Sequence, residues 1–276
     1  MRAIYVAFDQ LNLNYGLLKE AKPNETQILL IESQRMLKSR KWHFQRLFFL
    51  ISAARHFVKD LEDKGFKVHY LKSNSTREGI LEFINKTGIK EIDTLEPSSH
   101  RLTREISDIT KFYPTDFFLT SRLEFSNWAK VQKKLLMENF YRLQRRRLNI
   151  LMEGDEPIGG KWNYDDENRS PLPEGHKFSD YLKHKYDDID NAVIEELENS
   201  DLDLWGDKPD GSWGTTRAAA LKQLQHFISK NLDQFGPHED AMTTENWAVN
   251  HSLLSPYLNN GLLHPEEVLK GVLKKE

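Results

Sequence analysis

Cysteine is absent from this chain of 276 residues. Without thiolates the chain cannot form a disulfide, a cysteine-ligated zinc site or an iron–sulfur cluster of its own. No apolar run approaches the roughly 18–20 residues that a membrane-spanning helix needs. Met1 and Arg2 lead directly into a short segment typical of a strand rather than of a signal peptide. We therefore expect a soluble, cytoplasmic protein that makes no membrane contact.

An excess of one charge is also lacking. The 42 acidic residues nearly balance the 39 lysines and arginines, which gives a formal net charge of −3. The whole molecule therefore exerts no attraction for nucleic acid, and any such binding must come from a local basic patch. A hydrophobic content of 38%, with 11% aromatic residues, supports a packed core in one large or two ordinary domains.

Short apolar runs alternate with helical periodicity in the first half of the chain. Each run has the length of a buried strand, although the fourth is weaker than the first three and the fifth is only a candidate. The expected strands are residues 3–8, 27–31, 66–71, 91–95 and 116–119.

A helix is expected between the second and third strands. Phe44, Leu47 and Phe48 begin a series of apolar residues at three- and four-residue steps that runs to Leu61, and Gly65 provides the stop. Continuous apolar strands separated by helices are typical of a parallel sheet covered on both faces. The sequence thus predicts a doubly wound α/β domain with a parallel five-stranded sheet.

The pattern becomes helical in the second half. One helix is expected over residues 125–147, followed by a long loop rich in proline and glycine. Residues 187–200 are rich in acidic side chains, and we expect them to form a solvated helix. From Thr215 onward the chain is expected to be helical again, with a break at Gly236. The side chains expected to be buried in the first of these helices are Trp128, Leu135, Leu136, Phe140 and Leu143.

Polar side chains follow the first two strands. Asp9 and Gln10 come after the first strand, behind Phe8, and Glu32 follows the second. Ligands of open parallel sheets bind beyond the carboxyl ends of the strands, so these side chains can meet at a binding edge. The glycine-rich turn of dinucleotide-binding folds is missing, which excludes a nicotinamide-dependent dehydrogenase. The edge can hold a small polar heterocycle, or the residues can merely cap helices.

A dense basic cluster occurs once in the sequence, at Arg142, Arg145, Arg146 and Arg147. Such a run is commonly one solvated face of a helix. Arginine beside aromatic side chains can also neutralise phosphates and stack on displaced bases, so a nucleic-acid surface is the alternative. The loop that follows alternates cations with aromatics, at Lys161, Trp162, Tyr164 and Arg169.

Residues 251–255 form the last candidate segment, directly ahead of Pro256. Proline is tolerated in the first turn of a helix, so this segment marks a helix start. A helix N-terminus with hydroxyls and free N–H groups can bind phosphate, although the same pattern also serves as a simple cap. The histidines show neither metal-ligand spacing nor a catalytic triad, so nothing indicates a hydrolase or a metalloenzyme.

Taken together, these segments resemble the photolyase-related proteins of bacteria, the branch of the cryptochrome/photolyase superfamily that includes the prokaryotic (6-4) photolyases. The resemblance covers nearly the whole chain. Phe-Asp-Gln-Leu at 8–11 stands where the family usually has Gly-Asp-Gln-Leu, and Ser-Ala-Ala-Arg-His-Phe at 52–57 is similar to the family's Ser-Ala-Met-Arg-His-Phe. The long block over 137–169 and Ser-Leu-Leu-Ser-Pro-Tyr-Leu at 252–258 complete it.

The resemblance implies an α/β domain that can hold a 6,7-dimethyl-8-ribityllumazine antenna, an interdomain loop, and a helical domain around FAD. In the family, light-excited reduced flavin donates an electron to a pyrimidine photoproduct in DNA. The residues implied are Phe8, Asp9, Gln10 and Glu32 for the antenna; His238, His251, Ser252, Leu253, Leu254 and Ser255 for FAD; and Lys161 and Arg169, beside Arg142, Arg145 and Arg146 of the basic cluster, for DNA.

The chain departs from the family pattern near its end. His238 stands where the family has a tyrosine, and the family's helical domain, with its cluster-binding cysteines, continues well beyond Glu276. We expect an antenna-type domain over residues 1–135, a helix and interdomain loop over 136–204, and the start of the FAD domain over 205–276. With only one wall of the flavin pocket, the chain is not expected to retain FAD.

Three hypotheses stay open. The chain is the N-terminal part of a light-driven DNA repair enzyme, from a split gene or a truncation; or it is a stand-alone chromophore- or nucleotide-binding module; or it is a non-catalytic subunit that docks with a separately encoded C-terminal flavin domain. By itself it is expected to bind DNA weakly, without base preference and with strong dependence on salt.

Overall fold

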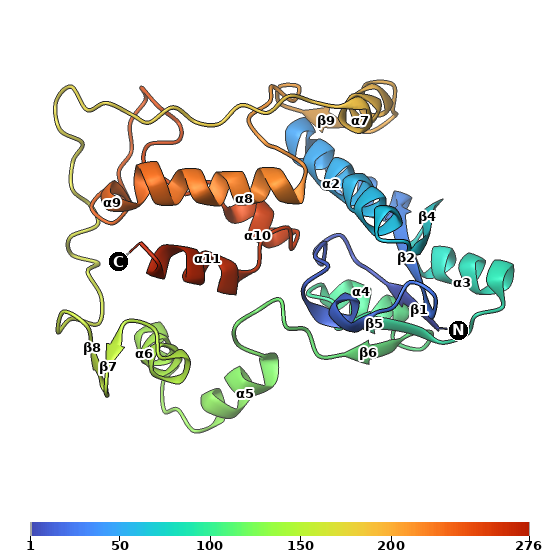
Figure 1. Cartoon of the computed structure of the whole chain (residues 1–276), viewed down its shortest axis with the longest axis horizontal. Coiled ribbons are helices and arrows are strands. Elements are labelled where there is room, and N and C mark those ends of the chain that lie inside the picture. Colours follow the sequence, from blue (N-terminus) through green and yellow to red (C-terminus); the bar gives the residue numbers. More distant parts are fainter. Residues whose placement is uncertain (1, 276) are drawn as a thin grey trace.

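A five-stranded parallel sheet forms one half of the computed structural model, which describes residues 2–275 (Figure 1). The strand order is β4-β2-β1-β5-β6, and each neighbouring pair is parallel. The doubly wound fold predicted from the sequence is therefore confirmed. The strands are β1 (Arg2–Tyr5), β2 (Thr26–Ser33), β4 (Lys67–Ser73), β5 (Ile92–Leu95) and β6 (Lys111–Tyr113).

The fifth strand lies earlier than predicted. β6 ends at Tyr113, and residues 116–119 do not form a strand. Pro114 follows β6 directly, and proline lacks the backbone N–H that a further step of the ladder needs. The apolar run at 116–119 instead packs as a loop, in which Phe117 is buried against Tyr15 and His264.

Different helices cover the two faces of the sheet. On one face, Ile80 and Phe83 of α3 and Ile106 of α4 pack on the strands, while α2 covers the opposite face. The helix predicted over 44–61 is α2, and it stops before Gly65 as expected. The helices of this half are α1 (Gln34–Leu37), α2 (Phe44–Asp63), α3 (Thr76–Thr87) and α4 (His100–Ile106), with a short 3₁₀ turn η1 (Gly16–Glu20).

The C-terminal helices share one core with the α2 face of the sheet. Leu224 and Tyr257 belong to the same buried cluster as Ile4, Phe49 and Phe57, although they are far apart in the sequence. In Figure 1 the first of these helices accordingly begins beside α2. They comprise α8 (Arg217–His226), the π-helical turn η2 (Phe227–Asn231), α9 (Leu232–Phe235), α10 (Ser255–Asn259) and α11 (Pro265–Leu273).

The single helix predicted over 125–147 is two helices. α5 begins at a capping box of Ser121 and Glu124, and α6 follows after a break at residues 131–136. Leu135, Leu136 and Leu143 are exposed, so their predicted burial was wrong. The periodic pattern was real, but the segment has no packing partner for those side chains among the described residues. The bounds are α5 (Arg122–Lys130) and α6 (Met137–Leu148), at the lower edge of Figure 1.

The acidic helix after the long loop is not a merely solvated one. Its Val193 and Leu197 are buried against α2, together with Leu47 and Ile51. Asp190 is buried as well, and the other acidic residues of the helix are exposed, so the composition concealed an amphipathic helix. This helix is α7 (Asp188–Glu198); the short strands of the second half are β7 (Met152–Glu153), β8 (Glu156–Pro157) and β9 (Leu204–Trp205), the last paired with β3 (Trp42–His43).

Two further expectations concern the C-terminal half. The helical stretch from Thr215 ends at α9, next to the predicted break at Gly236, and α10 carries Pro256 in its first turn. Over residues 2–275, no helix combines the length and the apolar character needed to cross a bilayer.

Tyr257→Phe tests the shared core. The Tyr257 side chain is fully buried, and its hydroxyl accepts a hydrogen bond from the Gly214 N–H at 3.3 Å. Removing the hydroxyl leaves that buried N–H without a partner, which costs about 1–3 kcal/mol. Urea unfolding should show the loss, whereas Tyr164→Phe, at a half-exposed ring, should unfold like the wild type. Equal stability of both variants would contradict this role for Tyr257.

Candidate functional site

A cavity of about 210 Å³ opens at the carboxyl edge of the sheet. Phe8 and Asp9, which follow β1, contribute to its wall, and so do Ile31 and Ser33 of β2. Apolar rings and hydrogen-bonding groups therefore face the same small space, as in many sites for planar ligands. Other lining residues are Trp42, Leu50, Arg101 and Asn259.

Asp9 is the acidic residue of the β1 edge in this cavity. Burial raises the pKa of its carboxyl group, while a hydrogen bond with Ser98 acts in the opposite direction. A partly desolvated carboxyl group at a ligand-sized hollow is a candidate for binding a polar ring edge.

Glu32 points to the other face of the sheet. Its neighbours Ile31 and Ser33 line the cavity, and side chains alternate along a strand, so Glu32 faces away from the hollow. Its carboxylate instead accepts hydrogen bonds from Arg55 at 3.1 Å and from the Tyr70 hydroxyl at 2.5 Å. The side chain is almost fully buried by these partners.

Gln10 is also separate from the cavity. It is buried beside Tyr15 and Leu95, and its backbone N–H donates to the Ala7 carbonyl. Of the four residues expected at one antenna edge, the structure therefore brings only Phe8 and Asp9 together.

A larger cleft of about 880 Å³ adjoins this cavity. The two hollows share Leu50 and Asn259 as lining residues, so they are neighbours across the end of α2. Trp213 and Trp247 face the cleft, with ring centroids 5.9 Å apart. Ser255, at the start of α10, lines it as well.

Residues 251–255 make a sharply turned segment between α9 and α10. Leu253 has a φ of 56°, a left-handed conformation that is unusual for a bulky side chain, and Val249 has a φ of 47°. The Ser252 carbonyl accepts a hydrogen bond from Gln223, and Leu254 is buried. Such strained turns are concentrated at binding sites.

His238 and His251 are anchored to the preceding loop. His238 is buried, and its Nδ1 lies 2.9 Å from the amide nitrogen of Asn250. His176 packs edge-on against its ring. The Nε2 of His251 lies 3.0 Å from the Glu239 carbonyl. The two histidines thus belong to one polar cluster beside the turned segment.

The basic cluster surrounds a single indole ring. The guanidinium groups of Arg142, Arg145 and Arg146 lie 5.2, 5.6 and 4.5 Å from the centre of Trp162. Arg145 is buried and donates to the carbonyls of Ile150, Leu151 and Trp162, so it organises the loop. Arg146 is exposed, and Arg142 is half-buried.

Lys161 and Arg169 lie in the same loop but carry carboxylate partners. Lys161 is paired with Glu167 at 2.8 Å, and Arg169 with Asp240 at 3.2 Å. These pairs are exposed, so each contributes little to stability and can exchange for another anion.

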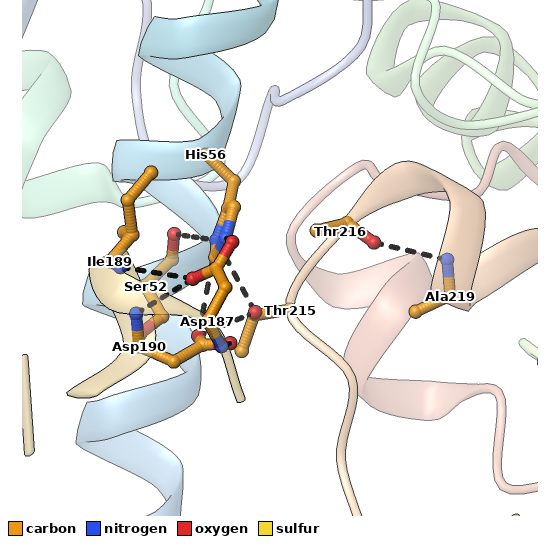
Figure 2. Close-up of polar contacts among 8 residues, drawn as sticks. All are labelled: Ser52, His56, Asp187, Ile189, Asp190, Thr215, Thr216 and Ala219. Carbon is orange, nitrogen blue, oxygen red and sulfur yellow. Dashed lines mark hydrogen bonds and ion pairs between the residues drawn. The ribbon is translucent and has the colours of Figure 1, made fainter. Parts of the chain in front are cut away.

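Sequence reasoning missed a polar cluster that joins three elements (Figure 2). His56 of α2 places Nε2 3.0 Å from a carboxylate oxygen of Asp187 and Nδ1 2.9 Å from the Ser52 carbonyl. Thr215, just before α8, donates to Asp190 at 2.8 Å. The separation in sequence hid it, although His56 stands in the Ser-Ala-Ala-Arg-His-Phe motif.

The same cluster has the composition of a metal site. Ligand atoms of His56, Asp187 and Asp190 all lie within 4.8 Å of one another. Each of these groups already has a hydrogen-bond partner in the chain, since Asp187 also caps α7 through the N–H groups of Ile189 and Asp190. The cluster therefore joins α7 and α8 to α2 through its own hydrogen bonds.

Arg55, next to His56, forms a second attachment of α7. It is paired with Glu196 at 2.6 Å, and Lys72 reaches the same carboxylate at 2.8 Å. Arg55 and then Lys72 lower the pKa of Glu196 to about 2, against an ordinary value of 4.5. The pKa of Asp187 is also lowered, because hydrogen bonds with His56 and the α7 N–H groups outweigh its burial.

The fold and the site define a class of protein: a doubly wound α/β domain, continuous with a helical part, with a ligand-sized hollow at the edge of its sheet. A profile of the family described as deoxyribodipyrimidine photo-lyase-related protein matches residues 4–213. The chain belongs to this family, and the resemblance inferred from the sequence is confirmed.

Two photolyases that the chain matches are considerably longer than it is. A curated "(6-4) photolyase" of Agrobacterium fabrum is 32% identical over 286 aligned positions, which cover 97% of this chain and 55% of that protein. An uncharacterised protein of Acanthamoeba polyphaga mimivirus is 25% identical over 161 positions, or 54% of this chain and 81% of its own length. The crystal structure of a bacterial class III photolyase from Agrobacterium tumefaciens aligns with a TM-score of 0.57 at 18% identity, over 98% of this chain and 52% of that one. The chain thus spans about half the length of the photolyases that it matches.

Glu196→Gln tests the attachment of α7 by its pH dependence. The folded pKa is depressed, so the stabilisation is present above pH 4.5 and is lost as the pH falls towards about 2. The variant should be less stable at pH 7 and should lose less stability than the wild type between pH 4.5 and 2. Urea unfolding across this range measures the difference. Glu195→Gln, at a neighbouring carboxylate of α7, should behave as the wild type, and identical pH profiles of all three proteins would exclude the attachment.

Proposed function

We propose that this chain is the chromophore-binding and DNA-facing part of a photolyase-related flavoprotein that uses light to repair pyrimidine photoproducts. The cavity at the sheet edge, in a member of the photolyase-related family, carries the proposal. The naming of a relative as a "(6-4) photolyase" supports the substrate class.

A ribityllumazine antenna suits the cavity and the adjoining cleft together. The cavity, at about 210 Å³, is smaller than typical ligand sites of roughly 300–1,000 Å³. We therefore assign only the ring system of the ligand to it. The ribityl chain would extend past Leu50 and Asn259 into the larger cleft. Phe8 and Trp42 supply apolar contact, while Asp9 and Arg101 supply polar contacts for the ring edge.

Asp9→Asn tests the antenna site. A hydrogen bond to a charged group contributes about 1.5–3 kcal/mol, so the change should weaken binding of 6,7-dimethyl-8-ribityllumazine about tenfold or more. Fluorescence titration of the purified chain measures the affinity. Asp63→Asn is the control, since this exposed carboxyl group at the end of α2 does not line the cavity and should leave the affinity unchanged. Equal weakening by both changes would show that Asp9 makes no specific contact with the ligand.

FAD fits the turned segment before α10. Among the described residues, the backbone N–H groups of Ser252 and Leu253 have no acceptor in the chain, and free N–H groups in a tight turn suit phosphate oxygens. Ser255, on the wall of the cleft, would add a hydroxyl, and His251 and His238 would border the flavin. When bound, the flavin supplies the electron that the repair reaction needs.

The flavin site, by this proposal, needs more protein than these residues. A cofactor of this size has most of its surface enclosed, and residues 238–255 contribute only one side. We propose that a separately encoded C-terminal flavin domain supplies the remainder, and that the chain alone does not retain FAD. A stand-alone antenna module is the second candidate, because the lumazine cavity is formed within this chain alone.

The loop over residues 161–169, which contains Trp162, is proposed to contact DNA together with the end of α6. Arg142 and Arg146 lie against Trp162, and the exposed pairs of Lys161 and Arg169 can open in favour of phosphates. Phosphate contacts are independent of sequence, so binding should lack base preference.

Lys161→Ala combined with Arg169→Ala tests the DNA surface. Each lost phosphate contact removes about 0.9 from the slope of log affinity against log salt, so the double variant should bind less tightly and with a slope flatter by about 2. Fluorescence anisotropy with duplex DNA at several salt concentrations measures both. Lys86→Ala with Lys90→Ala, which changes the net charge equally on another surface, should retain the wild-type slope. If both double variants match the wild type, Lys161 and Arg169 do not contact DNA.

A further inference from the structure

Exposed apolar side chains are concentrated in one short segment. Of the 17 large hydrophobic side chains exposed among residues 2–275, nine lie between residues 118 and 143, about a tenth of the chain. Large exposed apolar patches mark interaction sites more often than single scattered residues do. The nine are Phe118, Leu123, Phe125, Val131, Leu135, Leu136, Met137, Tyr141 and Leu143.

The segment is nevertheless well ordered by its own contacts. Phe125, Trp128 and Phe140 pack ring to ring with centroids 4.8–5.7 Å apart, which joins α5 to α6. Arg122 ties the start of α5 to Glu96, and Arg147 ties the end of α6 to Glu124. The apolar surface is therefore presented by a preformed pair of helices, which lowers the entropic cost of binding.

Helical spacing places part of this surface in one strip. Leu136, at the N-cap of α6, and Leu143, within α6, are seven residues and therefore about two helical turns apart, while α5 buries none of its side chains. The α5–α6 face is defined here by the outward apolar residues on both helices and the turn between them: Leu123, Val131, Leu135, Leu136, Met137 and Leu143. A strip of this spacing matches the apolar stripe of another helix.

Lysines border the α5–α6 face. Lys130, Lys133 and Lys134 are exposed in or beside the turn between the helices, and no carboxylate lies within 4.0 Å of them among the described residues. A partner with carboxylates around its apolar stripe would be complementary. A second copy of this chain, docked face to face, would instead bring lysines against lysines.

The greater length of the matched photolyases indicates what kind of partner the α5–α6 face could bind. The match to the Agrobacterium fabrum relative covers 97% of this chain but only 55% of that longer protein. The rest of such a protein has no counterpart in these 276 residues. Apolar surface on the shared part is where the rest would pack.

We infer that the α5–α6 face is the docking surface for a helical polypeptide whose apolar stripe is rimmed by carboxylates, and which corresponds to the part of the longer relatives outside the match. The inference rests on the proposed function, because it identifies where the separately encoded flavin domain would bind. The free lysines set its orientation, and the leucines and Met137 supply the buried contact.

Co-expression tests the docking surface. The full chain, carrying an affinity tag, is produced together with the part of the Agrobacterium fabrum photolyase that lies outside its match to this chain. The two should co-purify and elute together in size-exclusion chromatography. Leu136→Ser with Met137→Ser should reduce the recovered partner about tenfold or more, because truncation of central apolar contacts removes most of the binding energy. Both side chains are more than half exposed, so the variant should fold.

Controls separate the remaining outcomes. Leu81→Ser with Leu221→Ser removes two exposed apolar side chains elsewhere and should retain the partner. The inference is overturned if the wild-type chain recovers no partner, if both double variants recover it equally, or if the Leu136–Met137 change instead abolishes a self-association seen by analytical ultracentrifugation. It is likewise overturned if that change abolishes binding to phosphatidylserine vesicles, since the face would then bind a membrane.

The proposed function can fail independently of this docking. A partner that co-purifies while the lumazine titration of the wild-type chain shows no binding would keep the docking surface and reject the antenna. Lumazine binding at Asp9 without a co-purifying partner would keep the antenna and reject the docking surface.

Discussion

Two adjacent side chains on α2 hold the second half of the molecule in place. Arg55 bridges Glu32 of the sheet and Glu196 of α7, and His56 reaches Asp187 at the start of the same helix. The long loop before α7 has little regular structure of its own, so these contacts, with the apolar packing of α7 on α2, decide where the following helices lie. Because Glu32 and His56 are buried, loss of a partner would leave polar groups unsatisfied rather than merely exposed.

This attachment also shapes the hollows at the sheet edge. α2 contributes Leu50 to both the cavity and the cleft, and α10 contributes Asn259 to both. The position of α10 depends in turn on the core around Tyr257. A ligand in these hollows would therefore contact both halves of the chain, so binding and the packing of the halves stabilise one another.

Much of the fold could be predicted from local patterns. Buried strands read as continuous apolar runs, and α2 shows its periodicity and its stop at Gly65. The errors came where packing overrides pattern. Leu135 and Leu136 have the apolar character of a core but lie on an exposed turn, and α7 was expected to be solvated because its acidic side chains outnumber its two buried apolar ones. Whether a periodic stripe is buried depends on a distant partner, which periodicity does not specify.

The sequence by itself determined the α/β class, the family, and the exclusion of thiolate chemistry, because strand runs, motif residues and composition are local properties. Only the tertiary structure decided which of the candidate residues share a site. Asp9 faces the cavity and Glu32 faces away, since neighbouring positions of β2 alternate between the two sides of the sheet. Arg145 is buried and donates hydrogen bonds to the backbone of the following loop. His56 contacts Asp187, which is 131 positions away in the sequence. Such contacts arise from how the helices pack, which no local segment encodes.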